Sequence, residues 1–219
     1  QDLEGATLTA GVLYSDWSAG DEPPPFETIG VVDGQYLSQA SETGREHFRA
    51  HVSRLDAAGY DVRRVDFLPD IDTINERHES LVAGEMALSH DEWYEAYGDR
   101  YAEETRSFIE RGKTVGVGEL CSFRNSRKRL RESIQEHMDD REIDVVVSPS
   151  APGPAPSGIE STGNPVMNLP WTHALLPTVS VPASTTDDGL PIGLQCTTRS
   201  GRDEWLLSWC REIESALDR

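Results

Sequence analysis

The chain has 219 residues, of which 37% are hydrophobic, so it can form one large domain or two small ones around a real core. It is strongly acidic, with 39 Asp and Glu residues against 20 Lys and Arg and a formal net charge of −19. This charge argues against nucleic acid and anionic membranes as partners, and the apolar runs are too short for a membrane span. We therefore expect no nucleic acid and no membrane among its partners.

The first seventy residues predict a strand, a helix and a second strand. TLTAGVLYS (7–15) is apolar and β-branched ahead of a turn, which predicts a strand. Residues 41–60 place apolar side chains on one helical face, with Ser41 as a cap and Gly59 as a left-handed stop. DVRRVDF (61–67) predicts the second strand. This order indicates parallel strands joined by a crossover helix.

The next segment, residues 71–142, is predicted to be mostly helical. Apolar side chains recur at helical spacing in 74–98, 100–112 and 117–140. A continuous apolar run at 142–150 then has the length of a strand that is buried on both faces.

The last segment, residues 143–219, predicts a further strand at 189–199 and a closing helix at 201–217. The helix is the clearest amphipathic one, because its large apolar residues repeat every four positions. Strands that alternate with helices indicate a layered α/β fold. Two breaks interrupt the pattern, one at 19–30 and one that begins at Pro149, from which nine of the thirteen prolines extend to Pro191.

The stretch NPVMNLPWTHALLPTVSVPAS (164–184) is apolar, but its four prolines argue against a helix through it and against one long central strand. It would connect two strands, at the place where open α/β sheets bind ligands. We expect an extended pocket wall with Asn168, Thr172 and His173 as polar handles. The alternative is that these three side chains satisfy buried backbone groups.

The sequence contains no complete set of catalytic groups. It lacks a G-x-S-x-G motif, and its three cysteines are predicted to be buried, reduced thiols, because they have no C-x-x-C spacing. His47 and His51 have a chelating i, i+4 spacing, but without an acid between them a solvated helix edge is the favoured interpretation, so we expect no metal. The basic cluster at 124–131 precedes Glu132, which favours a salt-bridged surface over nucleic-acid binding.

Two further features bear on the environment of the protein. Only Lys113 and Lys128 are lysines, and abundant acid with so little lysine is typical of proteins in concentrated salt, where screening removes self-repulsion. An ordinary acidic protein is the alternative. The start, QDLEG, has no apolar segment like that of a signal peptide, and the sparse cysteines suit a reducing compartment, so we expect a cytoplasmic protein.

Four stretches, in this order and spacing, resemble the C-terminal part of an amidase signature family enzyme. They are DVVVSPSAPGPAPSG (144–158), TGNPVMNLPWTHALLPTVSVPA (162–183), GLPIGLQ (189–195) and GRDEWLLSWCREIESAL (201–217). Upstream stretches such as LDAAGYDVRRVDF (55–67) resemble the middle of the family, and residues 1–16 resemble the strand that follows its catalytic core. The resemblance covers essentially the whole chain.

The resemblance implies one domain over 1–219, the C-terminal half of an α/β/α sandwich with a mixed sheet. The family hydrolyses carboxylic amides with a serine nucleophile, a second serine in a cis peptide and a lysine base, which come from an earlier glycine- and serine-rich region. That region has no counterpart here, so no catalytic residue, cofactor or metal is carried over. The implied partners are a small amide and either the missing N-terminal half or further copies of this chain. A non-catalytic remnant or binding module is the alternative, and a component of an aminoacyl-tRNA amidotransferase is a weaker variant of the enzyme hypothesis.

In the family, the region from Asn168 to Leu176 approaches the substrate pocket. The resemblance therefore implies a pocket wall, with the candidate residues Asn168, Trp171, Thr172, His173 and Leu175. Related enzymes often read W-T-H-A-G-L-P here, whereas this chain has Leu175 in place of the glycine. Leucine adds bulk and disfavours a positive φ, which either narrows the pocket or reflects relaxed selection.

If the chain forms only half of a sheet, at least one strand that the complete sheet would bury should lie at an edge. We expect 144–150 to be that strand, because its apolar residues do not alternate with polar ones and both of its faces require cover. We therefore expect the lone chain to be aggregated, oligomeric or partly molten, and to hydrolyse no amide.

The net charge of −19 also predicts a response to salt. Self-repulsion opposes compaction until counterions screen it, so the thermal midpoint should rise between dilute buffer and molar KCl. The rise should exceed that produced by an uncharged osmolyte such as sucrose. A midpoint that does not change with KCl would contradict the salt-adapted interpretation.

Overall fold

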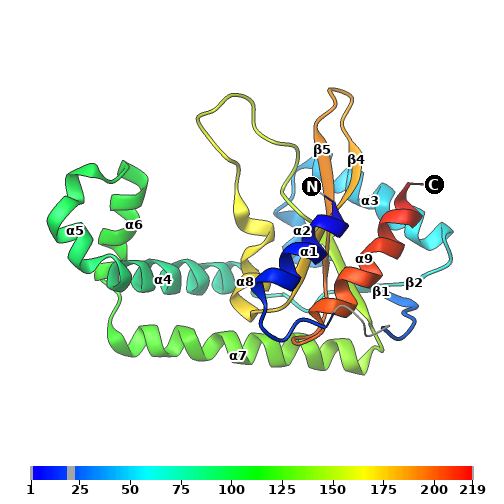
Figure 1. Cartoon of the computed structure of the whole chain (residues 1–219), viewed down its shortest axis with the longest axis horizontal. Coiled ribbons are helices and arrows are strands. Elements are labelled where there is room, and N and C mark those ends of the chain that lie inside the picture. The colour runs from blue at the N-terminus through cyan, green and yellow to red at the C-terminus, as the bar shows by residue number, and fades with distance from the viewer. Residues whose placement is uncertain (1, 19–22, 219) are drawn as a thin grey trace.

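A computed structural model describes residues 2–18 and 23–218, which form a five-stranded mixed sheet with helices on both faces (Figure 1). The strands are β1 (Thr28–Val32), β2 (Asp61–Val65), β3 (Val145–Pro149), β4 (Thr178–Thr185) and β5 (Pro191–Thr197), in the order β2-β1-β3-β5-β4. β1 pairs in parallel with β2 and β3, whereas β5 pairs antiparallel with β3 and β4. The predicted α/β class and mixed sheet are confirmed.

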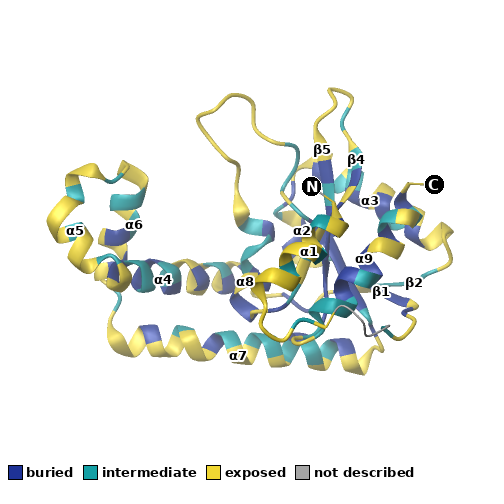
Figure 2. Cartoon of the chain, in the orientation of Figure 1, coloured by how far each residue is buried: buried dark blue, intermediate teal, exposed yellow. Residues whose placement is uncertain are grey.

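Two hydrophobic cores lie on opposite faces of the sheet, and β3 contributes to both. Val145 and Val147 face the core formed with α1 (Leu3–Leu13), α3 (Glu42–Ala57) and α9 (Asp203–Leu217). Val146 faces the core formed with α2 (Gly34–Ser38), α4 (Ile71–Ser89), α7 (Val117–Asp140) and α8 (Leu169–Ala174). Since side chains alternate along a strand, this assignment defines three layers, α/β/α. The central strands β1, β3 and β5 are largely buried between the helices, whereas the edge strands β2 and β4 are more exposed (Figure 2).

The expectation that 144–150 forms an edge strand is wrong. β3 lies between β1 and β5, and all five of its residues are buried. The edges are β2, which carries Arg63 and Arg64, and β4, which carries an exposed Pro182 beside a register shift. Charge, proline and irregular register are the features that keep sheet edges from pairing with other chains.

The first predicted strand, 7–15, is also wrong, because this segment lies largely in the helix α1. Asp2 caps the helix by accepting a hydrogen bond from the Gly5 N–H at 2.8 Å, and Thr7 and Thr9 donate to carbonyls one turn back. The true first strand, β1, begins within the predicted break at 19–30, of which residues 19–22 lie outside the described residues. A parallel β-α-β unit does form, but its first strand is β1 instead of 7–15, and α2 and α3 form its crossover.

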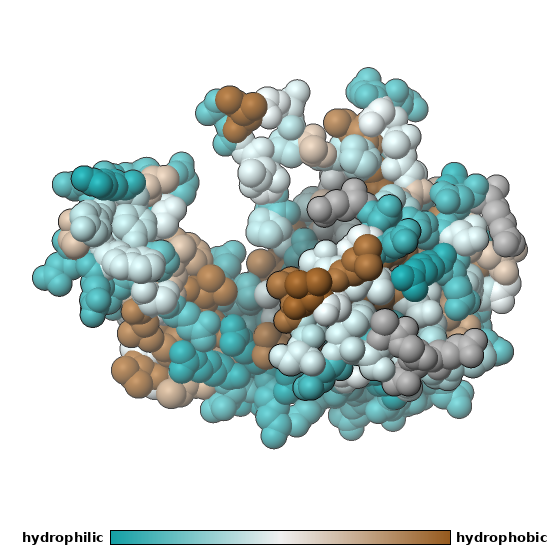
Figure 3. All heavy atoms as spheres, in the orientation of Figure 1, coloured by the Kyte–Doolittle hydropathy of each residue, from teal (hydrophilic) through white to brown (hydrophobic). Residues whose placement is uncertain are grey.

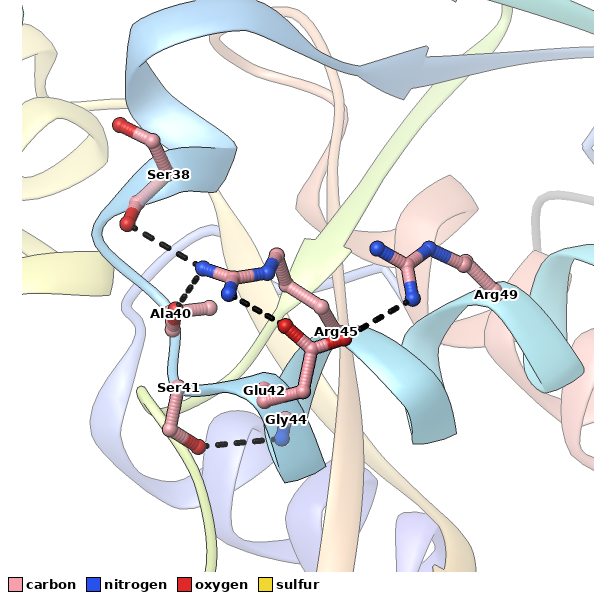
Figure 4. A network of polar contacts seen from close by, with 7 residues as sticks. All are labelled: Ser38, Ala40, Ser41, Glu42, Gly44, Arg45 and Arg49. Carbon is pink, nitrogen blue, oxygen red and sulfur yellow. Dashed lines mark hydrogen bonds and ion pairs between the residues drawn. The ribbon is translucent and has the colours of Figure 1, made fainter.

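A polar network fixes the turn between α2 and α3 (Figure 4). The Ser41 hydroxyl caps α3 by accepting from the Gly44 N–H at 3.1 Å, and Arg45 donates to the carbonyls of Ser38 and Ala40. Glu42 pairs with Arg45 at 2.6 Å and with Arg49 at 3.4 Å. These contacts give hydrogen-bond partners to carbonyl groups of the turn and to an N–H group in the first turn of α3. They therefore fix the conformation in which the chain enters the helix.

The predicted helical segment, 71–142, is confirmed, and part of it projects away from the sheet (Figure 1). α4 is followed by α5 (Asp91–Tyr97), a short 3₁₀ turn η1 (Gly98–Arg100) and α6 (Glu103–Lys113), which packs back on α4. α7 then returns along α4 to the sheet. The closing helix α9 is also as predicted. No helix in the described part of the chain is long and apolar enough to cross a membrane.

The expectation of a non-helical segment at 164–184 is wrong in part. A 3₁₀ turn η2 (Pro165–Met167) and α8 precede the strand β4. Pro165 and Pro170 stand in the first two positions of these helical turns, where the missing N–H has no helical partner to lose. Proline therefore starts the helices here instead of preventing them.

The contact between α4 and α6 depends on Gly112. A Cβ placed on this buried glycine would lie 1.9 Å from the carbonyl oxygen of Ala83. We predict that Gly112→Ala lowers the free energy of unfolding by about 2–3 kcal/mol, because overpacking forces the two helices apart. The control is Gly118→Ala in α7, where a Cβ meets nothing within 4 Å, and there stability should rise by up to about 1 kcal/mol. Urea unfolding of both variants measures the difference, and equal effects would contradict it.

Candidate functional site

A cavity of about 800 Å³ opens between α1, α8, β4 and α9, and we call it the α1 cavity. Four of the five predicted wall residues line it, namely Asn168, Trp171, Thr172 and Leu175. Much of the remaining lining is apolar or aromatic and comes from Tyr14, Trp17, Leu176, Val179, Leu206 and Leu207. The cavity thus combines a largely apolar wall with a few polar groups, as small-molecule sites do.

His173, the fifth predicted residue, lies on the other side of α8. Successive residues of a helix are rotated by about 100°, so His173 points roughly opposite to Trp171, although an extended wall would place both on one side. The Ser126 hydroxyl donates to the Phe123 carbonyl at 2.7 Å, and its oxygen therefore accepts from His173 Nε2, also at 2.7 Å. His173 is thus a buried contact between α8 and α7.

The environment of His173 keeps its imidazole neutral. Burial, followed by the nearby His78, Arg127 and Arg77, lowers the pKa of His173 to about 4. The ring of His78 stands edge-on to it with centroids 5.6 Å apart, and burial also lowers the pKa of His78. At neutral pH this pair therefore contributes hydrogen bonding and packing without charge.

A buried hydrogen-bond network holds Trp171 in the wall. Trp171 Nε1 donates to the Tyr36 hydroxyl at 3.1 Å, and that hydroxyl donates to the Met167 carbonyl at 2.7 Å. Gln195 Nε2 donates to the same carbonyl at 3.2 Å and to Ser148 Oγ at 3.0 Å. Burial raises the pKa of Tyr36, which stays protonated and able to donate. The network joins α8 to α2 and to the two strands β3 and β5.

The other polar handles differ in what they contact. Asn168 Nδ2 donates to the Ser150 carbonyl at 3.2 Å, so this side chain both lines the cavity and satisfies backbone. Thr172 is exposed at the cavity. Sequence reasoning missed Gln195, although a lone amide in the apolar strand GLPIGLQ was a signal for it. It also missed the contribution of α1, because that segment was predicted to be a strand.

Leu175 ends α8 in the left-handed region, with φ 55° and ψ 44°. The expectation that leucine would avoid a positive φ here is wrong. Its backbone N–H donates to the Thr172 carbonyl at 3.2 Å, as in a helix C-terminus that glycine usually forms. A left-handed leucine costs about 1–2 kcal/mol relative to an ordinary conformation. Its side chain remains 53% exposed at the mouth of the cavity, so the fold, rather than burial of this side chain, imposes the conformation.

The two histidines with chelating spacing do not form a solvated helix edge. His47 Nδ1 and His51 Nε2 both contact Ser184 Oγ of β4, at 2.9 and 2.8 Å, and His51 is 1% exposed. Burial, then His47 and Arg54, lower the pKa of His51 to about 4. Across the described residues no three His, Cys, Asp or Glu side chains gather as a metal site.

The cysteines differ from one another. Cys196 and Cys210 are buried as predicted, and a hydrogen bond between them together with burial raises the pKa of the Cys210 thiol. Cys121 is exposed, so the prediction of burial is wrong for it. A raised pKa disfavours the thiolate that a nucleophilic cysteine needs.

Neither lysine has the environment of a general base. Lys113 Nζ bonds Glu110 at 2.9 Å and stands over the Tyr94 ring at 4.3 Å, and the bond to Glu110 raises the pKa of Lys113. Lys128 pairs with Glu132 at 3.5 Å on the surface. A catalytic lysine needs a lowered pKa, the opposite of the shift at Lys113.

Two arginines of the basic cluster of α7 form salt bridges, as predicted, but with a partner on another helix. Arg124 and Arg127 pair with Glu85 of α4 at 3.0 and 3.5 Å.

The sequence and the fold place this chain among known proteins. The family model for Amidase matches residues 22–207, and the chain belongs to this family. It is 27% identical to a glutamyl-tRNA(Gln) amidotransferase subunit of Haloarcula marismortui, over 77% of this chain and 46% of that protein. It is 28% identical to mandelamide hydrolase of Pseudomonas putida, over 90% of this chain and 45% of that protein. The chain spans about half the length of these relatives.

Solved structures share the fold at lower sequence identity. A crystal structure of an amidase superposes with a TM-score of 0.86 at 22% identity, over 99% of this chain and 51% of that one. Fatty acid amide hydrolase superposes with a TM-score of 0.77 at 18% identity, over 93% of this chain and 42% of that one. The α/β/α arrangement described above is therefore the fold of this family.

The strain at Leu175 yields a stability prediction. Leu175→Gly should raise the free energy of unfolding by about 1 kcal/mol, because glycine adopts the left-handed conformation without a Cβ clash. Leu175→Ala is the matched control, since it removes the same exposed side chain but keeps the Cβ, and it should give no gain. Chemical denaturation measures both variants. Equal stability of the two would show that the backbone is not strained here.

Proposed function

We propose that this chain is the C-terminal part of an amidase and that it supplies the wall of the substrate pocket to catalytic residues located elsewhere. The observation that carries the proposal is the α1 cavity, whose wall α8 belongs to a segment that matches the amidase family. The described residues support one folding unit over 1–219, because the strands of both the first and last thirds share one sheet.

The surroundings of the two lysines support a catalytic centre outside this chain. Amide hydrolysis by serine needs a group that removes the hydroxyl proton, and in this family that group is a lysine. Lys113 and Lys128 are ion-paired surface residues, so neither is suited to act as this base. We propose that the intact enzyme forms an acyl-enzyme on a serine of the missing half and that water then releases the acid.

The substrate suggested by the cavity is an amide with an apolar acyl group. Aromatic and aliphatic side chains dominate its lining, whereas Asn168 and Gln195 offer amide groups near the wall. Apolar contact contributes most of the binding energy in such sites, and a few polar groups orient the ligand.

Two surfaces are suited to contact the missing half. β4 is an edge strand that pairs only with β5 among the described residues, so its regular part before Pro182, residues 178–181, can accept a further strand. α1 exposes Leu8, Val12 and Leu13, and Figure 3 shows a hydrophobic band over this helix. We propose that the exposed apolar surface of α1, rather than the strand β3, makes the lone chain prone to self-association.

A non-catalytic binding module is the alternative function. Leu175, in place of the glycine usual in related sequences, favours it, since a strained leucine at the mouth of the cavity is consistent with relaxed selection. An upstream coding segment with a lysine and a glycine- and serine-rich motif would favour the enzyme instead.

The proposal predicts that the lone chain hydrolyses no amide. Co-expression with the N-terminal half of mandelamide hydrolase, a relative matched over 90% of this chain, should give a complex that hydrolyses aromatic amides. The same N-terminal half expressed alone is the control. Turnover by the lone chain would place catalytic residues within residues 1–219. A stable complex without turnover would favour the binding module.

A further inference from the structure

A second cavity, of about 330 Å³, lies on the opposite side of α8 from the α1 cavity, and we call it the α4 cavity. Its lining comes from the link between β2 and α4, from α4 and α7, and from His173 of α8. None of its lining residues belongs to the α1 cavity. The mechanism proposed above gives it no role.

Two arginines that line this cavity have no partner. Arg77 of α4 and Arg129 of α7 make no hydrogen bond, ion pair or cation–π contact within the described part of the chain. In a chain with 39 acidic residues, carboxylate partners are abundant, and Arg124 and Arg127 on the same helix find one in Glu85. Two guanidinium groups from different helices thus face one hollow with their donors unused.

Part of the cavity lining is polar. Ser126, Ser133 and His137 contribute to it together with the buried His173. Burial, followed by His78, Arg127 and Arg77, lowers the pKa of His173, so the positive charge of Arg77 and Arg127 acts on this lining residue.

Two acidic residues, Asp66 and Asp70, also belong to the lining. The Asp66 carboxylate lies against Gly34 at the start of α2, where a Cβ on that glycine would be 2.5 Å from Asp66 Oδ1. Asp70 is exposed at the N-terminus of α4, and seven residues, or about 10 Å of helix, separate it from Arg77. Neither carboxylate pairs with Arg77 or Arg129 in the described part of the chain, so both guanidinium groups remain open to an anion.

We propose that the α4 cavity binds a tetrahedral oxyanion, a phosphate or sulfate group, either free or carried by a small organic molecule. A guanidinium group donates two parallel hydrogen bonds to an oxyanion. A tetrahedral anion presents oxygens in more than one plane, so arginines from two helices can each engage a pair, and the Ser133 hydroxyl can donate to another oxygen. Since His173 and Trp171 lie on the same short helix, the bound anion would stabilise the wall of the α1 cavity from behind.

Equilibrium dialysis of the 219-residue chain against radiolabelled inorganic phosphate tests the proposal, because it does not depend on the oligomeric state. KCl at about 0.2 M suppresses the exclusion of anions by the net negative chain. We expect one phosphate bound per chain at millimolar phosphate, displaced by sulfate but not by added chloride. Arg77→Gln and Arg129→Gln should each weaken binding about tenfold or more, which is the loss expected for one charge-assisted contact.

The matched control is Arg131→Gln, which removes the same charge from the same helix outside the cavity lining and should change affinity less than about twofold. Glycerol phosphate in place of phosphate distinguishes the ligand source: tighter binding assigns an organic phosphate, and equal binding assigns the free anion. Absence of phosphate retention by the unaltered chain would overturn the proposal. An equal loss in Arg129→Gln and Arg131→Gln would also overturn it, because it would indicate only a general charge effect.

Discussion

The carbonyl oxygen of Met167 accepts two buried hydrogen bonds, one from the Tyr36 hydroxyl and one from the Gln195 amide, and the placement of α8 depends on them. An unpaired buried carbonyl is costly, so the segment before α8 can dock only where both donors meet it. Tyr36 comes from α2 and Gln195 from β5, two elements that are distant in sequence and adjoin the central strands of the sheet. A proline-rich segment with little regular structure is thereby held to a rigid sheet, and Trp171 is fixed through the same hydroxyl.

Local patterns in the sequence predicted the elements whose burial is one-sided. The repeat of Trp205, Trp209, Ile213 and Leu217 identified α9, because a helix on a sheet buries one stripe. β1 was missed because TIGVV is buried on both faces and so shows no alternation, and it follows a proline run. Likewise, β3 was recognised as a strand but misplaced at an edge, since strand order is set by long-range pairing that the local sequence does not encode.

The same distinction applies to the candidate site. The segment and four of its wall residues were predicted from the sequence, but its conformation was not, because Pro165 and Pro170 start helical turns as readily as they end them. The helix then rotates His173 away from Trp171 and into a second cavity. The short helix α8 thus separates the largely apolar α1 cavity from the more polar α4 cavity. A conformational change in α8 would therefore alter the lining of both cavities.

The central claim is that α8 forms the acyl wall of an active site completed by another part of the enzyme, and the size selectivity at Leu175 tests it most directly. In the reconstituted enzyme, kcat/KM is measured across amides of increasing acyl size for the original chain and for Leu175→Gly. We predict that the variant gains activity selectively toward the bulkier acyl groups, because the side chain at the mouth of the α1 cavity is removed. An unchanged size profile would contradict this claim.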